Sequence, residues 1–200
     1  MATYFKAIRP DGASFHDPSF MWATEVGGVT YHPTHGKSGN TSTAAGYLSV
    51  STTATDCTGM RWPCRLLEVE PVGEVFTPDP AGLPNKRAGL VFRTVRELPA
   101  TDALGPQGVH LVALIERCAG LADDDARKLR AARGGAWGAA GAAGAAWDAA
   151  RDAGAAWDAA WALVVRDLIG DTFTQAHYDT LTMPWRTVIG PIHPDDAAVS

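Results

Sequence analysis

The sequence predicts an α+β protein, with a small, mostly antiparallel β-domain followed by an alanine-rich helical domain of three or four helices. The first half has short runs of β-branched and aromatic residues between turns rich in proline and glycine. The second half is rich in alanine, and its apolar residues follow a helical period. The composition changes near Leu98-Pro99, so we expect a β-rich domain over residues 1–98 and a helical domain over residues 99–200.

The first half has the pattern of five or six short strands. The first, Thr3–Ile8, ends at the turn signal Arg9-Pro10-Asp11-Gly12. The segment Thr77–Asn85 contains several prolines, which cannot donate to a strand ladder, so it is expected to be a loop. The other expected strands are Gly27–His32, Tyr47–Ser51, Arg65–Glu70 with its extension Gly73–Phe76 after Pro71, and Leu90–Val95.

The second half begins with a helix predicted over Val109–Cys118, for which Gly120 is a suitable C-terminal stop. A second helix is expected to begin near Ala122 and to weaken or break at Gly134-Gly135, because glycine disfavours helix. The last segment, Phe173–Ile189, predicts a short helix followed by a kinked or separate last turn, because Pro184 interrupts it.

Between these helices, one apolar stripe follows a spacing of alternately three and four residues. Such spacing places the stripe along one side of a helix. Three large aromatic side chains dominate it, so the sequence predicts docking to a protein partner or to a second copy through this surface. The stripe consists of Trp147, Ala150, Gly154, Trp157, Trp161, Val164 and Leu168.

Charge and composition exclude several classes of protein. The formal net charge of −5 argues against a protein whose main activity is coating nucleic acid. The N-terminus has no apolar leader and no stretch reaches the roughly 20 apolar residues of a membrane span, so a cytoplasmic protein is expected. Cys57, Cys64 and Cys118 are interpreted as reduced thiols, although Cys57 and Cys64 are close enough in sequence to form a disulfide.

Other local patterns have a chemical and a structural interpretation. His32 and His35 flank a proline, and no third ligand is near in sequence, so no metal site is expected. Glu68 and Glu70 share one face of a strand, as paired catalytic carboxylates do, but a solvated sheet face explains them as well. Cys57 has no evident base beside it and is interpreted as a buried thiol.

Four segments of the first half together resemble a domain of unknown function found in phages and actinobacteria. The tryptophan-aspartate-alanine-alanine repeats of the second half resemble the tails of actinobacterial members. The resemblance covers residues 1–98 and implies no defined activity. It rests on residues 4–12, 46–51, 65–75 and 85–87 together with 95–98.

The same order of segments is more distantly similar to the ADP-ribosyltransferase core, which would imply NAD as the cosubstrate. The resemblance assigns a basic residue of the first strand, Arg9 or Lys6, and then Tyr47, Ser49 and Ser51 of a middle strand, to the catalytic site. The loop that carries a catalytic glutamate in that family reads Pro84-Asn85-Lys86-Arg87 here and has no carboxylate. Without that carboxylate, the positively charged sugar transition state lacks its stabilising group.

Two functions therefore follow from the sequence. The first is a non-enzymatic interaction or binding module that needs no cofactor and docks or self-associates through Trp147, Trp157 and Trp161. The alternative is a divergent ADP-ribosyltransferase-like enzyme that acts on NAD or a nucleotide.

Overall fold

A computed structural model describes residues 2–33, 46–57, 61–119, 122, 124–125, 127–128 and 174–198. The chain divides into two compact units, Met1–Gly105 and Pro106–Ser200. The first unit contains the β-sheet and the second contains the described helices α1 and α4. This arrangement confirms the α+β fold class, with a mostly β domain followed by helices.

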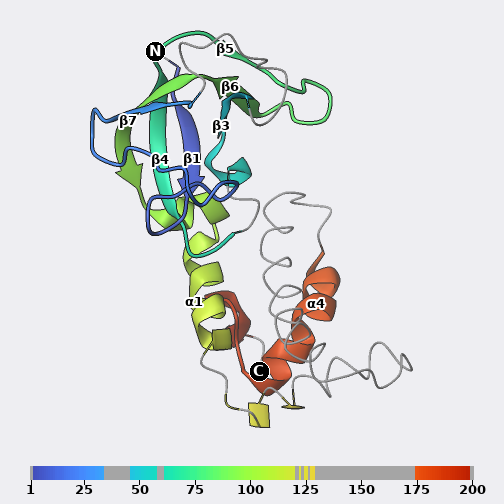
Figure 1. Cartoon of the computed structure of the whole chain (residues 1–200). Coiled ribbons are helices and arrows are strands. Elements are labelled where there is room, and N and C mark those ends of the chain that lie inside the picture. Colours follow the sequence, from blue (N-terminus) through green and yellow to red (C-terminus); the bar gives the residue numbers. More distant parts are fainter. Residues whose placement is uncertain are drawn as a thin grey trace, which may run out of the picture. The chain divides into compact units, whose positions relative to one another are not determined.

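Seven strands form one antiparallel sheet in the first unit, in the order β2-β7-β4-β1-β3-β6-β5 (Figure 1). Five of them overlap the expected strands. The sequence predicted that Gly73–Phe76 extends the strand at Arg65–Glu70, whereas Val75–Phe76 forms the separate strand β5 at the edge of the sheet. The last, β6, lies in a segment for which the sequence predicted no strand. The strands are β1 (Tyr4–Ile8), β2 (Val29–Tyr31), β3 (Leu48–Ser51), β4 (Arg65–Pro71), β5 (Val75–Phe76), β6 (Lys86–Gly89) and β7 (Val91–Leu98).

One face of the sheet packs a cluster of large apolar side chains, because alternate residues of β1, β3 and β4 point to the same side. The loop between β1 and β2 covers this face with Trp22, whose ring lies edge-on to Phe20 at 6.3 Å and tilted against Phe92 at 6.4 Å. We call this group the first core cluster: Ile8, Trp22, Leu48, Val50, Leu67, Val69 and Phe92.

A second core cluster lies on the opposite side, around Cys64, Leu66 and Ala103. Ala103 belongs to the short 3-10 helix η3 (Ala100–Leu104), which packs with its buried residues against the sheet unit. The division between the two units therefore falls after Gly105 and not at Leu98, where the composition changes.

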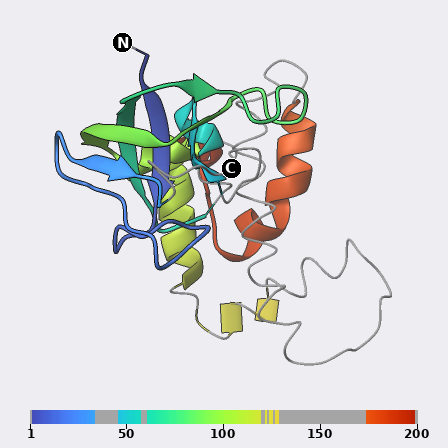
Figure 2. The same cartoon turned by 45° about the horizontal axis from the view of Figure 1, so that its top comes forward.

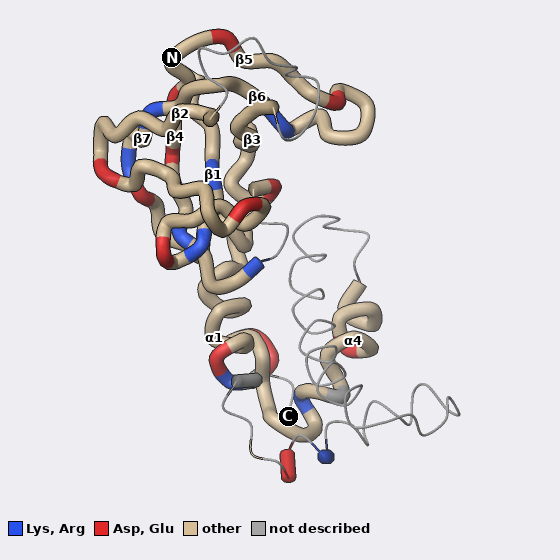
Figure 3. The backbone as a smooth tube through the Cα atoms, viewed as in Figure 1, with Lys and Arg blue, Asp and Glu red and all other residues tan. Residues whose placement is uncertain are grey.

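The carboxylates of β4 face arginines on the neighbouring strand β7, and Figure 3 shows the opposite charges side by side. Glu70 accepts a hydrogen bond from Arg93 at 2.8 Å, and Glu68 accepts one from Arg96. Both carboxylates are thus neutralised within the sheet. This pairing favours the structural interpretation of Glu68 and Glu70 over the catalytic one.

The hairpin of β5 and β6 forms one edge of the sheet, and its long connecting loop, residues 77–85, extends away from the sheet (Figure 2). A turn inside the loop is held by Asp79, whose carboxylate accepts from the backbone N–H of Gly82 at 2.9 Å. The prolines predicted this loop correctly. The strand that follows begins immediately at Lys86.

In the second unit, α1 (Gly108–Ala119) and α4 (Gln175–Val188) agree in position with two of the predicted helices. Thr174 caps α4 by accepting from the backbone N–H of His177 at 3.3 Å. The helix continues through Pro184, whereas the sequence predicted an interruption there. The loss of one backbone donor is tolerated because the flanking turns, which include the fully buried Thr182 and Trp185, stay helical.

The C-terminal 3-10 helix η5 (Pro194–Ala198) is organised by the carboxylate of Asp196. One of its oxygens accepts from the backbone N–H groups of Ile192 at 2.9 Å and His193 at 3.0 Å, and from the Tyr178 hydroxyl at 3.3 Å. Arg117 of α1 donates to the carbonyls of Ile189 and Pro191. Side-chain to backbone contacts thus fix the C-terminal segment within this unit.

The predicted tryptophan stripe, including Trp147, Trp157 and Trp161, lies outside the described residues. The same holds for Cys118 as a side chain, for His35 and for the predicted break at Gly134-Gly135. Within the described part of the chain, no helix is long and apolar enough to cross a membrane.

Candidate functional site

The candidate site lies where strands β1 and β3 separate. These strands are neighbours in the sheet but pair only at Phe5 and Ser51, whereas β1 pairs with β4 along its whole length. No other residues of β1 and β3 are opposed in the described ladder. Side chains from β1, β3 and β6 approach this opening.

Lys6 reaches the opening from the side of the first core cluster. Its side chain is buried, and its ammonium donates to the backbone carbonyl of Ser49 at 3.0 Å. The ammonium also lies 5.0 Å from the centre of the Trp22 ring, a cation–π distance. Burial is the main reason that the pKa of Lys6 falls to about 8, and the positive charge of Lys86 acts in the same direction.

Lys86 reaches the same region from β6. It lies directly opposite Ser51 in the ladder, and its ammonium donates to the Ser51 hydroxyl at 2.8 Å and to the Asp56 carbonyl at 2.6 Å. The Ser51 hydroxyl is fully buried and donates in turn to the same carbonyl at 3.2 Å. Burial lowers the pKa of Lys86, although the nearby Asp56 carboxylate acts against this shift.

Neither ammonium is paired with a carboxylate in the described ranges. Lys6 contacts a carbonyl and an aromatic ring, and Lys86 contacts a hydroxyl and a carbonyl. The Asp56 carboxylate instead accepts from the Thr53 hydroxyl and the Asn85 amide. A buried ammonium without a carboxylate contact is unfavourable, so Lys6, with the half-buried Lys86 near it, makes this region a candidate site for an anion.

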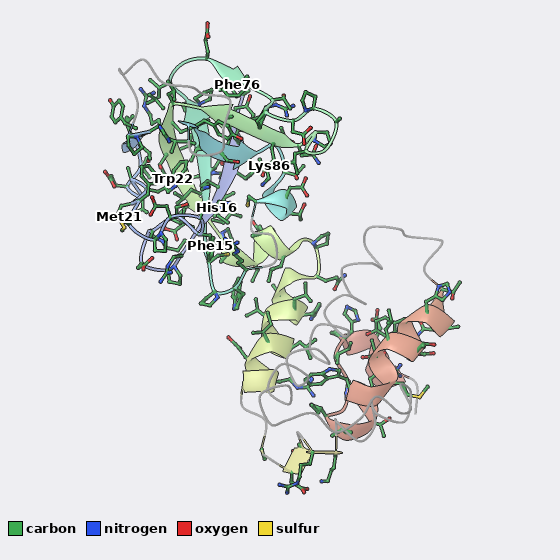
Figure 4. All side chains as sticks on the ribbon, turned by 45° about the vertical axis from the view of Figure 1, so that its right-hand side comes forward. Phe15, His16, Met21, Trp22, Phe76 and Lys86 are labelled. Atoms are coloured by element: carbon green, nitrogen blue, oxygen red, sulfur yellow. The ribbon has the colours of Figure 1, made fainter. Side chains whose placement is uncertain are left out.

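Two further basic side chains extend this positive region toward solvent. The exposed His16 has a lowered pKa because of desolvation and of the positive charges of Lys6, Arg61 and Lys86. Arg61 donates to the Phe15 carbonyl at 3.0 Å, and its guanidinium lies 5.6 Å from the centre of the Phe15 ring. Figure 4 labels His16, Phe15, Trp22 and Lys86 on the sheet unit. Basic groups thus lead from the surface to the buried Lys6.

Trp22 adds an unused donor. Its indole Nε1–H is buried and has no hydrogen-bond acceptor among the residues that the structure describes. Buried donors without a partner are uncommon in native proteins. Together, Lys6, Ser51, Lys86, His16 and Trp22 form what we call the lysine site, which is rich in donors and poor in negative charge.

Cys57 lies near both lysines of the lysine site, and Cys57 and Cys64 are both free thiols. Cys57 donates to the Ala54 carbonyl at 2.8 Å, within the short 3-10 helix η2 (Ala54–Asp56) and its C-cap. Burial raises the pKa of both Cys57 and Cys64 to about 11. Thiols held in the neutral form are poor nucleophiles, in accord with a buried, unreactive role.

The residues that the sequence proposed for catalysis have different partners. Arg9 lies at the end of β1 and forms a half-exposed ion pair with Asp11 at 3.4 Å. Tyr47 packs edge-on against Phe76, with ring centres 5.6 Å apart. Ser51 joins the lysine site through its side chain, whereas Ser49 contributes its backbone carbonyl.

The sequence named Lys6 as an alternative to Arg9. It mentioned Lys86 only because the segment that contains it lacks the glutamate of the ADP-ribosyltransferase core. It gave no indication of His16 or Trp22, because both lie in the irregular segment between β1 and β2, where no periodic pattern operates. A lysine amid the apolar and aromatic residues of a strand, as at Lys6, was the one local signal of this site.

Comparison of the chain with protein-family models, with curated proteins and with solved structures finds no match. The resemblances to the phage and actinobacterial family and to the ADP-ribosyltransferase core therefore stay predictions from the sequence.

Proposed function

We propose that the sheet unit is a binding module for a ligand that carries a phosphate or pyrophosphate group, and that the lysine site holds this group. The observation that carries the proposal is the buried ammonium of Lys6 with the half-buried ammonium of Lys86 near it, neither of which donates to a carboxylate in the described residues. A bound phosphate would supply the missing negative charge and accept charge-assisted hydrogen bonds from both lysines.

The surroundings of the lysines support an anion more than a cation or an apolar ligand. The lowered pKa of Lys6, about 8, leaves the side chain mostly charged at neutral pH, so it can bind an anion. His16 and Arg61 extend the positive potential to the surface, where it would attract a charged ligand. The buried Trp22 N–H is one more donor that an oxygen of the ligand could satisfy.

Isothermal titration of the whole chain with pyrophosphate tests this proposal. We expect binding that weakens at least about 10-fold in Lys86→Met, because a charge-assisted hydrogen bond is lost. Lys128→Met is the matched control, since Lys128 is an exposed lysine of the other unit that pairs with Asp124 at 2.7 Å. Equal affinity of all three proteins, or no binding to the wild type, would contradict the proposal.

ADP-ribosyl transfer from NAD is the second candidate. It is supported by the position of Ser51, which lies in the strand beside β1, the strand that carries Lys6. However, Lys86 donates to that serine from the segment where the family carries its glutamate. A positive charge at this position would destabilise a cationic sugar transition state. Release of nicotinamide from NAD by the wild type would favour the transferase over the binding module.

Docking or self-association through Trp147, Trp157 and Trp161, and a cytoplasmic location, are further parts of the proposal that rest on the sequence alone. Light scattering on the whole chain and on a 1–105 fragment tests the first of these. If the whole chain is monomeric, self-association is excluded and docking to another protein is the remaining interpretation.

A further inference from the structure

Two aromatic side chains, those of Tyr47 and Phe76, lie on the same face of the sheet as Lys86. Side chains of β3 alternate, so Tyr47, Ser49 and Ser51 point to one face, away from Leu48 and Val50 in the first core cluster. In the ladder, Ser51 is opposite Lys86 and Ser49 is opposite Ala88. Directly opposed residues of antiparallel strands share a face.

The same register continues to the edge strand β5. Phe76 is opposite Ala88, so Phe76 lies on the face of Ser51 and Lys86, whereas its neighbour Val75 packs against the first core cluster. Lys86 and Ala88 are two residues apart, a rise of about 6.6 Å, and the next strand lies about 4.8 Å away. The small side chain of Ala88 thus lies between the Lys86 ammonium on β6 and the Phe76 ring on the neighbouring strand β5.

The aromatic pair is partly open to solvent. The rings of Tyr47 and Phe76 meet edge to face at 86°, with centres 5.6 Å apart, and Phe76 is 40% exposed whereas Tyr47 is half-buried. This geometry holds both rings in place and leaves Phe76 accessible. Figure 4 labels Phe76 and Lys86 on the same unit. An aromatic surface beside an anion site matches the two ends of a nucleotide, a phosphate and a planar base separated by a sugar.

The geometry points to a nucleotide as the ligand of the lysine site, with its base packed on the Tyr47–Phe76 pair. This inference rests on the proposed function and adds the class of ligand. Stacking on an aromatic side chain depends on the face of the base and not on its hydrogen-bonding edge. The pair therefore favours any nucleotide over a phosphate that lacks a ring, and it discriminates weakly between bases.

Two matched ligands isolate the contribution of the base. Adenosine monophosphate and ribose 5-phosphate share the sugar and the phosphate and differ in the ring. We expect the whole chain to bind the nucleotide at least about 5-fold more tightly, in line with the usual strength of stacking. In Phe76→Leu the nucleotide should bind only as well as ribose 5-phosphate, whose own affinity stays unchanged.

Two control variants separate stacking from a structural effect. Phe76→Tyr should retain the preference for the nucleotide. Tyr31→Leu changes a 55% exposed aromatic residue on β2, at the opposite edge of the sheet, and should alter neither ligand. Loss of affinity for both ligands in Phe76→Leu would assign Phe76 a structural role and overturn the inference.

The outcome also distinguishes this inference from the proposed function. If pyrophosphate binds in a Lys86-dependent manner but the two sugar phosphates bind equally, the nucleotide inference is wrong and the anion site stands. If pyrophosphate, ribose 5-phosphate and the nucleotide all fail to bind, both are wrong.

Discussion

The ammonium of Lys6 lies 5.0 Å from the centre of the Trp22 ring, and the N–H of that ring has no acceptor among the described residues. The ring offers the ammonium a partial substitute for water. It leaves the charge uncompensated, however, and an unused donor lies on the same indole ring. An apolar side chain at this position of β1 would avoid the cost of burying a charge, which is why the pair is part of the proposed anion site.

Replacement of Lys6 by methionine should separate stability from binding. Methionine has a similar length and carries no charge, so we expect the free energy of unfolding to stay the same or rise by about 1–2 kcal/mol. Binding of pyrophosphate should weaken at least about 10-fold. Urea unfolding and calorimetric titration measure the two effects, and a loss of more than about 2 kcal/mol in stability would mean that Lys6 is a structural residue.

Ser51→Ala and Ser49→Ala should differ, although both residues belong to the same Ser-x-Ser pattern. The Ser51 hydroxyl is buried between Lys86 and the Asp56 carbonyl, so its loss should destabilise the protein by about 1–3 kcal/mol. Ser49 meets Lys6 through its backbone carbonyl, which alanine retains, so its replacement should change stability by less than about 0.5 kcal/mol. Equal effects in chemical unfolding would contradict the assigned contacts.

Anion binding should weaken as the pH rises through about 8. An anion stabilises the charged form of Lys6, so the bound protein has a higher pKa at Lys6 than the free protein, in which it is about 8. The part of the pyrophosphate affinity that depends on Lys6 is therefore constant below pH 8 and falls above it. Lys6→Met should remove this part of the pH dependence. An affinity that rises from pH 8 to 9.5 would exclude Lys6 from the site.

The same group should act in the opposite direction on the stability of the free protein. The folded pKa of about 8 is lower than the unfolded value of 10.5, so the unfolded chain binds more protons between these two values. The contribution of Lys6 to stability therefore rises as the pH increases from 8 to 10.5. Comparison of the wild type with Lys6→Met by urea unfolding across this range isolates the contribution.

A fragment of residues 1–105 should fold, and a fragment of residues 1–98 should be less stable by at least about 2 kcal/mol. The shorter fragment lacks η3, whose buried Ala103 and Leu104 cover the unit, with Ala103 in the second core cluster around Cys64 and Leu66. Thermal unfolding of both fragments measures the difference. Equal melting temperatures would show that η3 is dispensable.

Asp196→Ala should destabilise the second unit by about 2–4 kcal/mol. The change removes the acceptor of two backbone N–H groups, those of Ile192 and His193, and of the Tyr178 hydroxyl. Tyr178→Phe is the milder comparison, since it removes one hydroxyl and leaves the backbone contacts in place. Hydrogen exchange at Ile192 and His193 should increase strongly in the first variant and little in the second.

Local patterns in the sequence were sufficient to predict most of the sheet and two helices. Alternation identified β4, where Leu67 and Val69 enter the core while Glu68 and Glu70 face the arginines of β7. The strand β6 was missed because Lys-Arg-Ala-Gly has neither alternation nor β-branched residues. Its strand conformation comes from pairing with its hairpin partner β5 and with β3, which is distant in sequence.

The sequence by itself determined the α+β class, the change of composition near Leu98 and the candidate strand with Tyr47, Ser49 and Ser51. Only the tertiary structure decided which basic residues act on one another. The charge of Lys86 lowers the pKa of Lys6 because Lys86 pairs with Ser51 in the ladder, and Ser51 pairs in turn with Phe5 of β1. Periodicity reports which face of an element is buried, whereas the convergence of charges depends on strand order and register across the sheet, which no local pattern contains.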